Sequence, residues 1–436
     1  MSVTIAGFPF WSLQFDKDGN GDATIATFLG ELPEAGLTDL FIFSHGWNND
    51  HATALDLYTR FFGAMRDVLE DGTAKLRLGV EIGCAGVFWP SILFPGDTPP
   101  AASDGGASSF SAGAEPPSLE SELPKAFCDP DQQAKLNDLI GLLNTRPSDN
   151  EALFEFRDKL RSIITLPELG STQDSLEALT QTDNDRWLEL LDAAAQAHDD
   201  SEGGAASVGG FFDKMWNGAK QVLRVATYWE MKNRAGIIGK GSVGPLIAKI
   251  HKTLPSLKIH LIGHSFGARL VSYTLAGLSD GMVGPESPVK TLYLLQGAFS
   301  HFAFAPKLPF DSNRSGDLHG MAARVDGPLM ATFSKKDTAV GVAYPAASVL
   351  AGADASAAED VMYRWEGMGC DGAQASDAAV HTLGEPPYTF EPGSWLNLDG
   401  SSVIVAGGPP SGAHSDIVHP QTALVALLAA KVLAAT

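Results

Sequence analysis

A serine between two glycines is the feature of this sequence that most directly suggests chemistry. The segment Gly263-His-Ser-Phe-Gly267 follows an apolar run at 258–262 and precedes a helical pattern that starts at Ala268. A strand, a sharp turn and a helix are the setting of a nucleophile elbow, which exposes the serine hydroxyl at the end of a sheet. Because small residues on both sides of the serine allow the turn to close, we predict that Ser265 is a nucleophile.

A second segment, Gly277-Leu-Ser-Asp-Gly281, matches the same pattern in a different context. It closes a helical stretch and has no strand before it, so we interpret it as a helix-ending turn. The surrounding elements, and not the five-residue pattern alone, therefore support the prediction for Ser265.

A serine nucleophile needs a general base, and the base needs a partner that fixes its tautomer. Asp337 follows a predicted strand at 329–333, and His414 lies in a Gly/Pro-rich loop after a predicted strand at 402–405. The carboxyl ends of parallel strands share one edge of a sheet, so the three residues are expected to meet there. We predict that His414 is the base and that Asp337 orients it.

Other histidine and aspartate residues compete for these two roles. His419 heads a predicted helix, where a capping or buried role is favoured. Asp326 precedes its strand and is expected at the opposite sheet edge, and Asp311 lies in an irregular stretch. Asp416 is interpreted as a carboxylate at a helix start. We therefore prefer His414 as the base and Asp337 as the residue that orients it.

Acyl transfer also requires hydrogen-bond donors aimed at the developing oxyanion. The backbone N–H of Phe266 directly follows the nucleophile, and that of Trp47 lies in Ser44-His-Gly-Trp-Asn48, after a predicted strand at 40–43. We predict that these two groups form the oxyanion hole.

Three further side chains are predicted to contribute to substrate binding. His45 precedes the oxyanion segment, Trp89 ends a predicted strand at 86–89, and Tyr228 stands where an inserted helical region rejoins the rest of the chain. For each of them, packing in the core is the alternative.

The order of apolar and helical patterns predicts the fold class. Buried strands are expected at 40–43, 86–89, 258–262, 291–295, 329–333 and 402–405, and helices at 51–70, 244–253, 267–279 and 419–434. Continuous apolar runs that alternate with helices are typical of an α/β protein with a mostly parallel central sheet flanked by helices.

Residues 97–214 interrupt this alternation. They open with a Pro/Gly tract at 96–106 that predicts a linker, and continue with helical sequence, including a capping box at Ser148–Glu151 and a helix around 187–191. The stretch carries 23 acidic and 8 basic residues, so it accounts for most of the net charge of −22. We predict a catalytic core of 1–96 and 215–436 with an acidic helical cap inserted at 97–214.

Composition excludes several classes of protein. Of the 436 residues, 44% are hydrophobic, which is enough for a large core, whereas the charge of −22 argues against nucleic acid or anionic lipid as a partner. Three cysteines cannot build a disulfide framework, and neither a signal peptide nor a membrane-spanning run is recognised. A cytoplasmic location is expected, and the oligomeric state stays open.

Two other motifs are judged weak. Asp16–Asp22 reproduces the opening of a calcium-binding loop, but position twelve is Thr27 where a bidentate Glu is needed, so a polar turn is preferred and an opportunistic cation site stays open. Gly239–Gly244 matches a dinucleotide fingerprint without a preceding strand or a later acidic residue, so it predicts no cofactor.

Taken together, His45-Gly-Trp47, Gly263–Gly267, Asp337 and His414 resemble the α/β-hydrolase superfamily of serine esterases and lipases. The resemblance covers 1–96 and 215–436, and the insertion is similar in position to the cap of many members. It implies hydrolysis of a small-molecule carboxylic ester through an acyl-enzyme, with no metal or organic cofactor.

The same residues leave alternative functions open. A lipase, or an amide, thioester or lactone hydrolase, would use an identical set of groups, and a non-catalytic binding module of similar fold belongs to another class. Aromatic residues near the predicted site favour an apolar acyl or aryl group.

Overall fold

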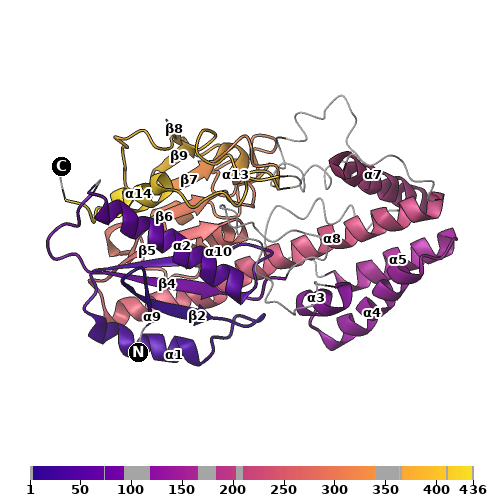
Figure 1. Ribbon diagram of the computed structural model, residues 1–436, viewed down its shortest axis with the longest axis horizontal. Coiled ribbons are helices and arrows are strands. Elements are labelled where there is room, and N and C mark those ends of the chain that lie inside the picture. The colour runs from indigo at the N-terminus through magenta and orange to yellow at the C-terminus, as the bar shows by residue number, and fades with distance from the viewer. Residues whose placement is uncertain are drawn as a thin grey trace. The chain divides into compact units, whose positions relative to one another are not determined.

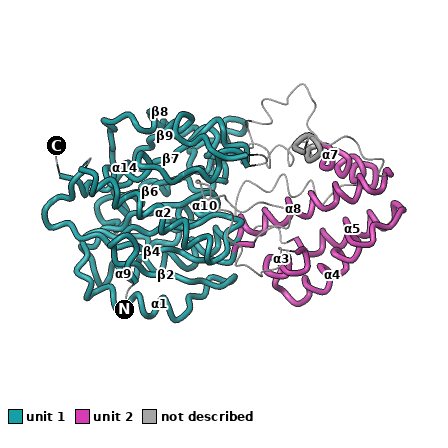
Figure 2. The backbone as a smooth tube through the Cα atoms, in the orientation of Figure 1, with its two compact units in different colours: residues 1–90, 234–340, 367–436 teal, residues 91–233, 341–366 magenta. Residues whose placement is uncertain are grey.

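The computed structural model describes residues 3–72, 74–92, 118–164, 183–202, 210–339, 363, 366–408 and 411–434, with only the backbone at 197–202. The chain divides into two compact units, which Figure 2 colours separately. Unit 1 comprises 1–90, 234–340 and 367–436, and unit 2 comprises 91–233 and 341–366. The linker tract predicted at 96–106 falls within the sequence range of unit 2 and lies outside the described residues.

Unit 1 is an α/β structure whose described residues form a nine-stranded sheet (Figure 1). The strand order is β1-β2-β4-β3-β5-β6-β7-β9-β8; β1 and β2 pair antiparallel, and every other neighbouring pair is parallel. The strands are β1 (Val3–Ile5), β2 (Phe8–Gln14), β3 (Asp39–Ser44), β4 (Ile82–Phe88), β5 (Lys258–His264), β6 (Val289–Leu295), β7 (Leu329–Phe333), β8 (Ala379–Thr382) and β9 (Trp395–Asp399).

Helices flank this sheet. The described residues of unit 1 include α1 (Ala23–Glu31), α2 (His51–Glu70), α9 (Gly244–Thr253), α10 (Phe266–Ala276), α13 (Met368–Asp371) and α14 (Pro420–Ala429), together with the end of α8 (Phe211–Ile238). Helices α2 and α14 share one apolar cluster with Phe10, Phe41 and Phe43. The neighbouring residue Trp11 contacts Phe28 of α1, and because successive strand residues point to opposite faces, α1 covers the other face.

Short helical turns of three or four residues connect some of these elements. They lie at Leu32–Ala35, Gly284–Glu286 and Met321–Arg324. A π-helical turn, Gly239–Val243, joins α8 to α9 and packs against α10. The segment Gly239–Gly244, whose match to a dinucleotide fingerprint was judged weak, is therefore a helical junction in the structure.

The central strands form because their sequences suit burial on both faces. All six residues of β3 are buried, as are six of the seven residues of β5. Three polar side chains enter this apolar centre: His260 Nε2 lies 3.1 Å from Asp39 Oδ1, and its Nδ1 lies 3.1 Å from Thr291 Oγ1. They stand near the amino ends of their strands, so this network braces the edge of the sheet opposite Ser265.

One predicted strand is wrong. Residues 402–405 form a turn, in which the N–H groups of Val403 and Ile404 both donate to the carbonyl of Gly400. The strand at this place in the sheet is β9, which begins seven residues earlier. Its buried Asn397 interrupts the apolar pattern, so hydropathy did not indicate a strand. Both ends of the Asn397 amide bond the backbone of Ala373. Ile404 is apolar because it packs in the core.

Unit 2 is helical in its described residues. It contains α3 (Leu119–Ala126), α4 (Pro130–Thr145), α5 (Asn150–Ile163) and α7 (Asn184–Glu202), together with α8 (Phe211–Ile238) up to residue 233. Phe156 contacts both Trp187 and Trp216 in its interior. The capping residue of α5 is Asp149, which accepts from the N–H of Ala152, so the capping box predicted from Ser148 is wrong.

The loop between β2 and α1 closes on itself. Asp16 Oδ1 accepts from the backbone N–H groups of Asp18 and Asn20, and Asp22 caps α1 by accepting from Thr24. These carboxylates are thus used in forming the polar turn. Within the described ranges, no helix is long and apolar enough to cross a membrane.

Candidate active site

Ser265 occupies a sharp turn between β5 and α10. Its backbone lies at φ 58° and ψ −121°, a conformation that L-residues rarely adopt and that costs energy unless surrounding contacts enforce it. The Ser265 N–H donates to Leu295 O at 3.1 Å, and its carbonyl accepts from Ala298 N at 3.2 Å. The last residue of β6 and the backbone after it therefore hold the turn from both sides.

Close backbone packing makes the turn possible. A Cβ on Gly267 would overlap the carbonyl oxygens of Ser44 and His45, and one on Gly46 would lie 2.5 Å from Ser265 Cβ. The start of α10 and the segment after β3 therefore touch directly. This contact places the loop of Trp47 beside the serine.

The structure brings the three predicted catalytic residues into one hydrogen-bonded series. His414 Nε2 lies 2.8 Å from Ser265 Oγ, and His414 Nδ1 lies 2.8 Å from Asp337 Oδ2. All three are buried or nearly so. A carboxylate accepts from Nδ1–H, so the arrangement leaves Nε2 as the acceptor of the serine proton.

The loops that carry the acid and the base are bonded to each other. Ala413 N donates to Lys336 O at 2.9 Å, and Asp337 pairs with Gly412 in an isolated bridge. The imidazole of His264, on β5, bonds the carbonyl of His414 at 2.9 Å. The base is thus connected both to the loop of its acid and to the strand of the nucleophile.

Asp416 has a role that differs from the prediction. It does not stand at a helix start, because α14 begins at Pro420 with His419 as the capping residue. Its Oδ2 accepts from the N–H groups of Val405 and Ala406, at 2.8 and 2.7 Å. The carboxylate thereby ties the beginning of the His414 loop to its end.

The other competing residues have their own partners away from the series. His419 lies 2.9 Å from Asp416, and Asp326 forms an ion pair with Lys290 at 2.6 Å. Asp311 accepts from the backbone N–H of Asn313 in a local turn.

The segment after β3 is held by its carbonyl groups. Trp89 Nε1 donates to His45 O at 3.1 Å, His45 Nδ1–H donates to Gly46 O at 2.8 Å, and Asn49 Nδ2 donates to Trp47 O at 2.8 Å. With three successive carbonyls bonded, the peptide planes of this loop are fixed. Phe266 is the first residue of α10, so its N–H belongs to the turn that lies outside the helical ladder.

His45 and Trp89, predicted to bind substrate, are both buried and stack on each other with ring centroids 5.3 Å apart. Their contacts brace the loop of Trp47, and a contact with substrate stays a prediction. Trp47 is half-buried, and its ring lies 6.3 Å from that of Phe266. Tyr228 is half-buried on α8 in unit 2, where its ring meets that of Trp229.

Sequence reasoning missed two residues beside the series. His264 lies inside the serine motif, but the pattern leaves that position unspecified. Gln296 follows β6 directly, and its Nε2 donates to Asp337 Oδ2 at 2.9 Å. A polar residue at the carboxyl end of a predicted strand was the available signal for Gln296.

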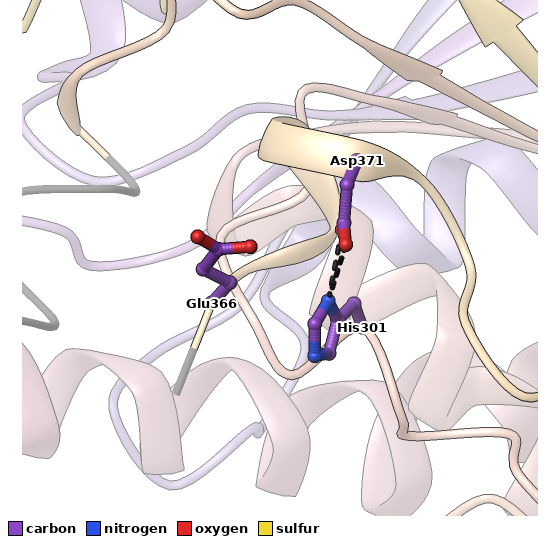
Figure 3. Close-up of side chains that lie close together, drawn as sticks. All are labelled: His301, Glu366 and Asp371. Carbon is purple, nitrogen blue, oxygen red and sulfur yellow. Dashed lines mark hydrogen bonds and ion pairs between the residues drawn. The ribbon is translucent and has the colours of Figure 1, made fainter. Parts of the chain in front are cut away.

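Another histidine–aspartate pair, in which His301 is buried and Asp371 is half-buried, lies in unit 1 (Figure 3). His301 Nδ1 lies 2.8 and 3.0 Å from the two carboxylate oxygens of Asp371. This pair ties α13 to the segment that follows β6. Figure 3 also draws Glu366, which is the last residue of unit 2 and does not belong to this pair.

Chemically, the arrangement around Ser265 can activate a hydroxyl group. A neutral imidazole accepts the Ser265 proton, and a buried carboxylate favours the imidazolium that results. Comparisons with protein-family models, with curated proteins and with solved structures find no match to this chain.

Replacing Gly46 by alanine is expected to destabilise the protein. The added Cβ would lie 2.5 Å from Ser265 Cβ and 3.1 Å from His264 O, and overpacking of this kind costs about 1–3 kcal/mol. Urea unfolding measures the change. Gly30→Ala is the control, since a Cβ there meets no atom within 4 Å. Equal midpoints for the two variants would contradict the close approach.

Stability is expected to fall as the pH is lowered below about 6.5. Burial lowers the pKa of His45 to about 4 and that of His264 to about 3, so both are neutral in the folded protein when their unfolded forms become protonated. The unfolded state then binds more protons, and each group removes about 1.4 kcal/mol per pH unit.

The His264→Asn variant isolates one of these contributions. Asparagine does not titrate and retains an N–H donor for the carbonyl of His414. Between pH 5.5 and pH 4, its free energy of unfolding should fall less steeply than that of the parent protein, by about 1.4 kcal/mol per pH unit. Identical slopes in urea titrations would mean that His264 is not neutral in the folded state.

Proposed function

We propose that this protein is a serine hydrolase of the α/β-hydrolase superfamily that cleaves carboxylic esters through an acyl-enzyme. The observation that carries the proposal is the continuous hydrogen-bonded series from Ser265 through His414 to Asp337. The mostly parallel sheet, with the serine in a turn between β5 and α10, is compatible with that fold.

In the proposed reaction, Ser265 Oγ attacks the ester carbonyl while His414 Nε2 takes its proton. Asp337 accepts from His414 Nδ1–H, which keeps the tautomer in which Nε2 is a base. The imidazolium then gives the proton to the leaving alcohol. Water, activated by the same imidazole, hydrolyses the acyl-enzyme and regenerates the serine.

The oxyanion formed in each step would be bound by the backbone N–H groups of Trp47 and Phe266. Support comes from the direct contact between Gly46 and Ser265, which brings the loop of Trp47 to the nucleophile. Donors that are fixed before reaction stabilise the transition state without reorganisation. The three bonded carbonyls of residues 45–47 supply that rigidity.

A binding module without catalysis is the less favoured function. Such a module would gain nothing from holding Ser265 at φ 58°, a conformation that persists only where the surrounding structure enforces it. A ligand-binding serine also needs no oriented imidazole and buried carboxylate behind it. The strained backbone of Ser265 and the hydrogen-bonded series of His414 and Asp337 behind it together favour a catalytic role for Ser265.

The acyl group preferred by the site is expected to be apolar. Trp47 stands on the loop that reaches the serine, Phe266 directly follows the serine, and their rings lie 6.3 Å apart. Apolar walls with few polar groups are typical of small-ligand sites. Turnover of p-nitrophenyl esters of graded chain length would measure this preference and separate short-chain esterase from lipase activity.

Labelling with a fluorophosphonate probe tests the mechanism. The folded protein should be modified at Ser265 alone, because only an activated serine attacks the phosphorus rapidly. Ser265→Ala should abolish both labelling and ester turnover. Ser279→Ala is the matched control, since Ser279 stands in the second Gly-x-Ser-x-Gly segment and is exposed. Mapping of the probe to another residue, or no labelling of folded protein, would overturn the proposal.

The acid is tested by a pair of aspartate variants. Asp337→Asn should lower kcat by about 10³- to 10⁴-fold, because an amide does not favour the required tautomer. Asp326→Asn should leave the rate near normal, because Asp326 pairs with Lys290 at the other end of its strand. Near-normal ester turnover in Asp337→Asn, together with a large loss in Asp326→Asn, would show that Asp337 is not the acid.

A further inference from the structure

Gln296 is a buried, conformationally unusual residue with no role in the mechanism described so far. Its exposed fraction is 0%, and its φ of 47° lies in the left-handed region, which few residues other than glycine adopt. Strained conformations of this kind persist where the surrounding structure demands them, and they cluster at functional sites.

The amide of Gln296 is bonded at both ends. Nε2 donates to Asp337 Oδ2 at 2.9 Å and to Gly369 O at 3.1 Å, while Oε1 accepts from Thr332 Oγ1 at 3.1 Å. The Gln296 N–H donates in turn to the same threonine hydroxyl at 3.2 Å. A flipped amide would direct its oxygen at a carboxylate and a carbonyl, so the chemistry of the partners fixes its orientation.

The backbone beside Gln296 contacts the nucleophile. Leu295 O accepts from Ser265 N, and Ala298 N donates to Ser265 O. Residues 295–298 therefore bind the turn of the serine through main-chain groups and the aspartate through the glutamine side chain. One short turn connects the first and the last member of the hydrogen-bonded series.

Gly369 closes the far side of the amide. A Cβ there would lie 2.9 Å from the carbonyl carbon of Gln296 and 3.0 Å from Asp337 Oδ2. Its N–H donates to Gly297 O, and its carbonyl also accepts from Ser334 N. Because the pair of His301 and Asp371 anchors α13, the acceptor for the second N–H of Gln296 is held in place.

We propose that Gln296 is a positioning residue for the base, acting by keeping the Asp337 carboxylate aimed at His414. The proposal rests on the function proposed above. Among the described residues, the imidazole of His414 and the amide of Gln296 each direct an N–H at Asp337 Oδ2. The amide disperses the carboxylate charge, so the imidazole is held in the correct tautomer without binding its proton too tightly.

Removing the amide donor has a predictable sign. With one donor lost, the negative charge on Oδ2 attracts the protonated imidazole more strongly, and His414 keeps its proton to a higher pH. The midpoint at which the base becomes neutral should therefore rise. A role confined to packing would lower stability and leave that midpoint unchanged.

Other charged or titratable groups surround this network and are the same in every variant. Lys335 and Lys336 follow β7 and are exposed, and His264 on β5 is neutral because its pKa is about 3. The carboxylates of Asp371 on α13 and Asp416 on the His414 loop are engaged by His301 and by backbone N–H groups. A shift on changing Gln296 alone is thus attributable to the amide.

The experiment compares Gln296→Met and Gln296→Glu with the parent protein. The first variant removes the donor at similar volume, and the second places a carboxylate against Asp337. Ring-proton NMR follows the protonation of His414, whose resonance is assigned by its absence in His414→Ala. The midpoint should rise by about one pH unit in Gln296→Met and further in Gln296→Glu.

Turnover of an ester gives the second readout. In Gln296→Met, kcat at pH 7 should fall about tenfold with KM within twofold, since Gln296 does not face the substrate, and the acidic limb of the pH profile should move with the NMR midpoint. An unshifted NMR midpoint in folded Gln296→Met and Gln296→Glu would overturn the proposal.

Asn397→Leu is the matched control for the loss of a buried amide. Within the part of the chain that the structure describes, the side-chain amide of Asn397 bonds only the backbone of Ala373, so its removal should lower the unfolding midpoint and leave the NMR midpoint of His414 unchanged. An equal shift of the His414 NMR midpoint in Asn397→Leu would mean that a general loss of stability causes the shift, and it would overturn the role of Gln296. Because the NMR midpoint needs no turnover, it decides the role of Gln296 even if Ser265 is not labelled and the proposed function fails.

Discussion

The contact between the Ser265 turn and the segment after β3 is the constraint on which the rest of the site depends. Hydrogen atoms at Gly46 and Gly267 occupy positions where a methyl group would collide with the serine or with the carbonyls of β3. Close contact fixes the serine at its strained φ and brings the loop of Trp47 beside it. Neither the proposed oxyanion hole nor the alignment with His414 would exist with ordinary side chains at these positions.

Around this contact, several buried polar side chains are hydrogen-bonded to backbone atoms. Asp416 binds the start of the His414 loop, His264 binds the carbonyl of His414, and His45 binds the loop that follows it. A buried polar group without a partner costs free energy, so each of these bonds disfavours movement of the loop it holds. The result is a rigid frame built from neutral imidazoles and a few carboxylates.

Much of this was predictable from sequence because of the way parallel sheets are built. The strands around 40–43, 258–262 and 329–333 were recognisable as continuous apolar runs, and the residues that follow them had to share one edge. The wrongly predicted strand at 402–405 did not change the expected position of His414. The true strand β9 also ends at the edge of the sheet that carries Ser265, before the same loop.

What could not be predicted depends on which loops meet in space. Gln296 belongs to no motif, and the role we propose for it depends on the pairing of β7 with β6, which places Asp337 beside it. Asn397 concealed a strand because its partners are backbone groups of a segment that sequence patterns did not place. Hydropathy patterns indicate buried segments only where the buried side chains are apolar. The amides of Gln296 and Asn397 are buried but polar, so these patterns did not indicate them.

The separation of the bonded residues along the chain has a consequence for folding. The hydrogen bond between Ser265 and His414 spans 149 positions, and the one between His414 and Asp337 spans 77. Contacts this distant in sequence form late, since the intervening strands must first join the sheet. The serine would therefore stay unreactive until the His414 loop docks, so the hydrolase we propose would gain its activity only after the intervening strands have joined the sheet.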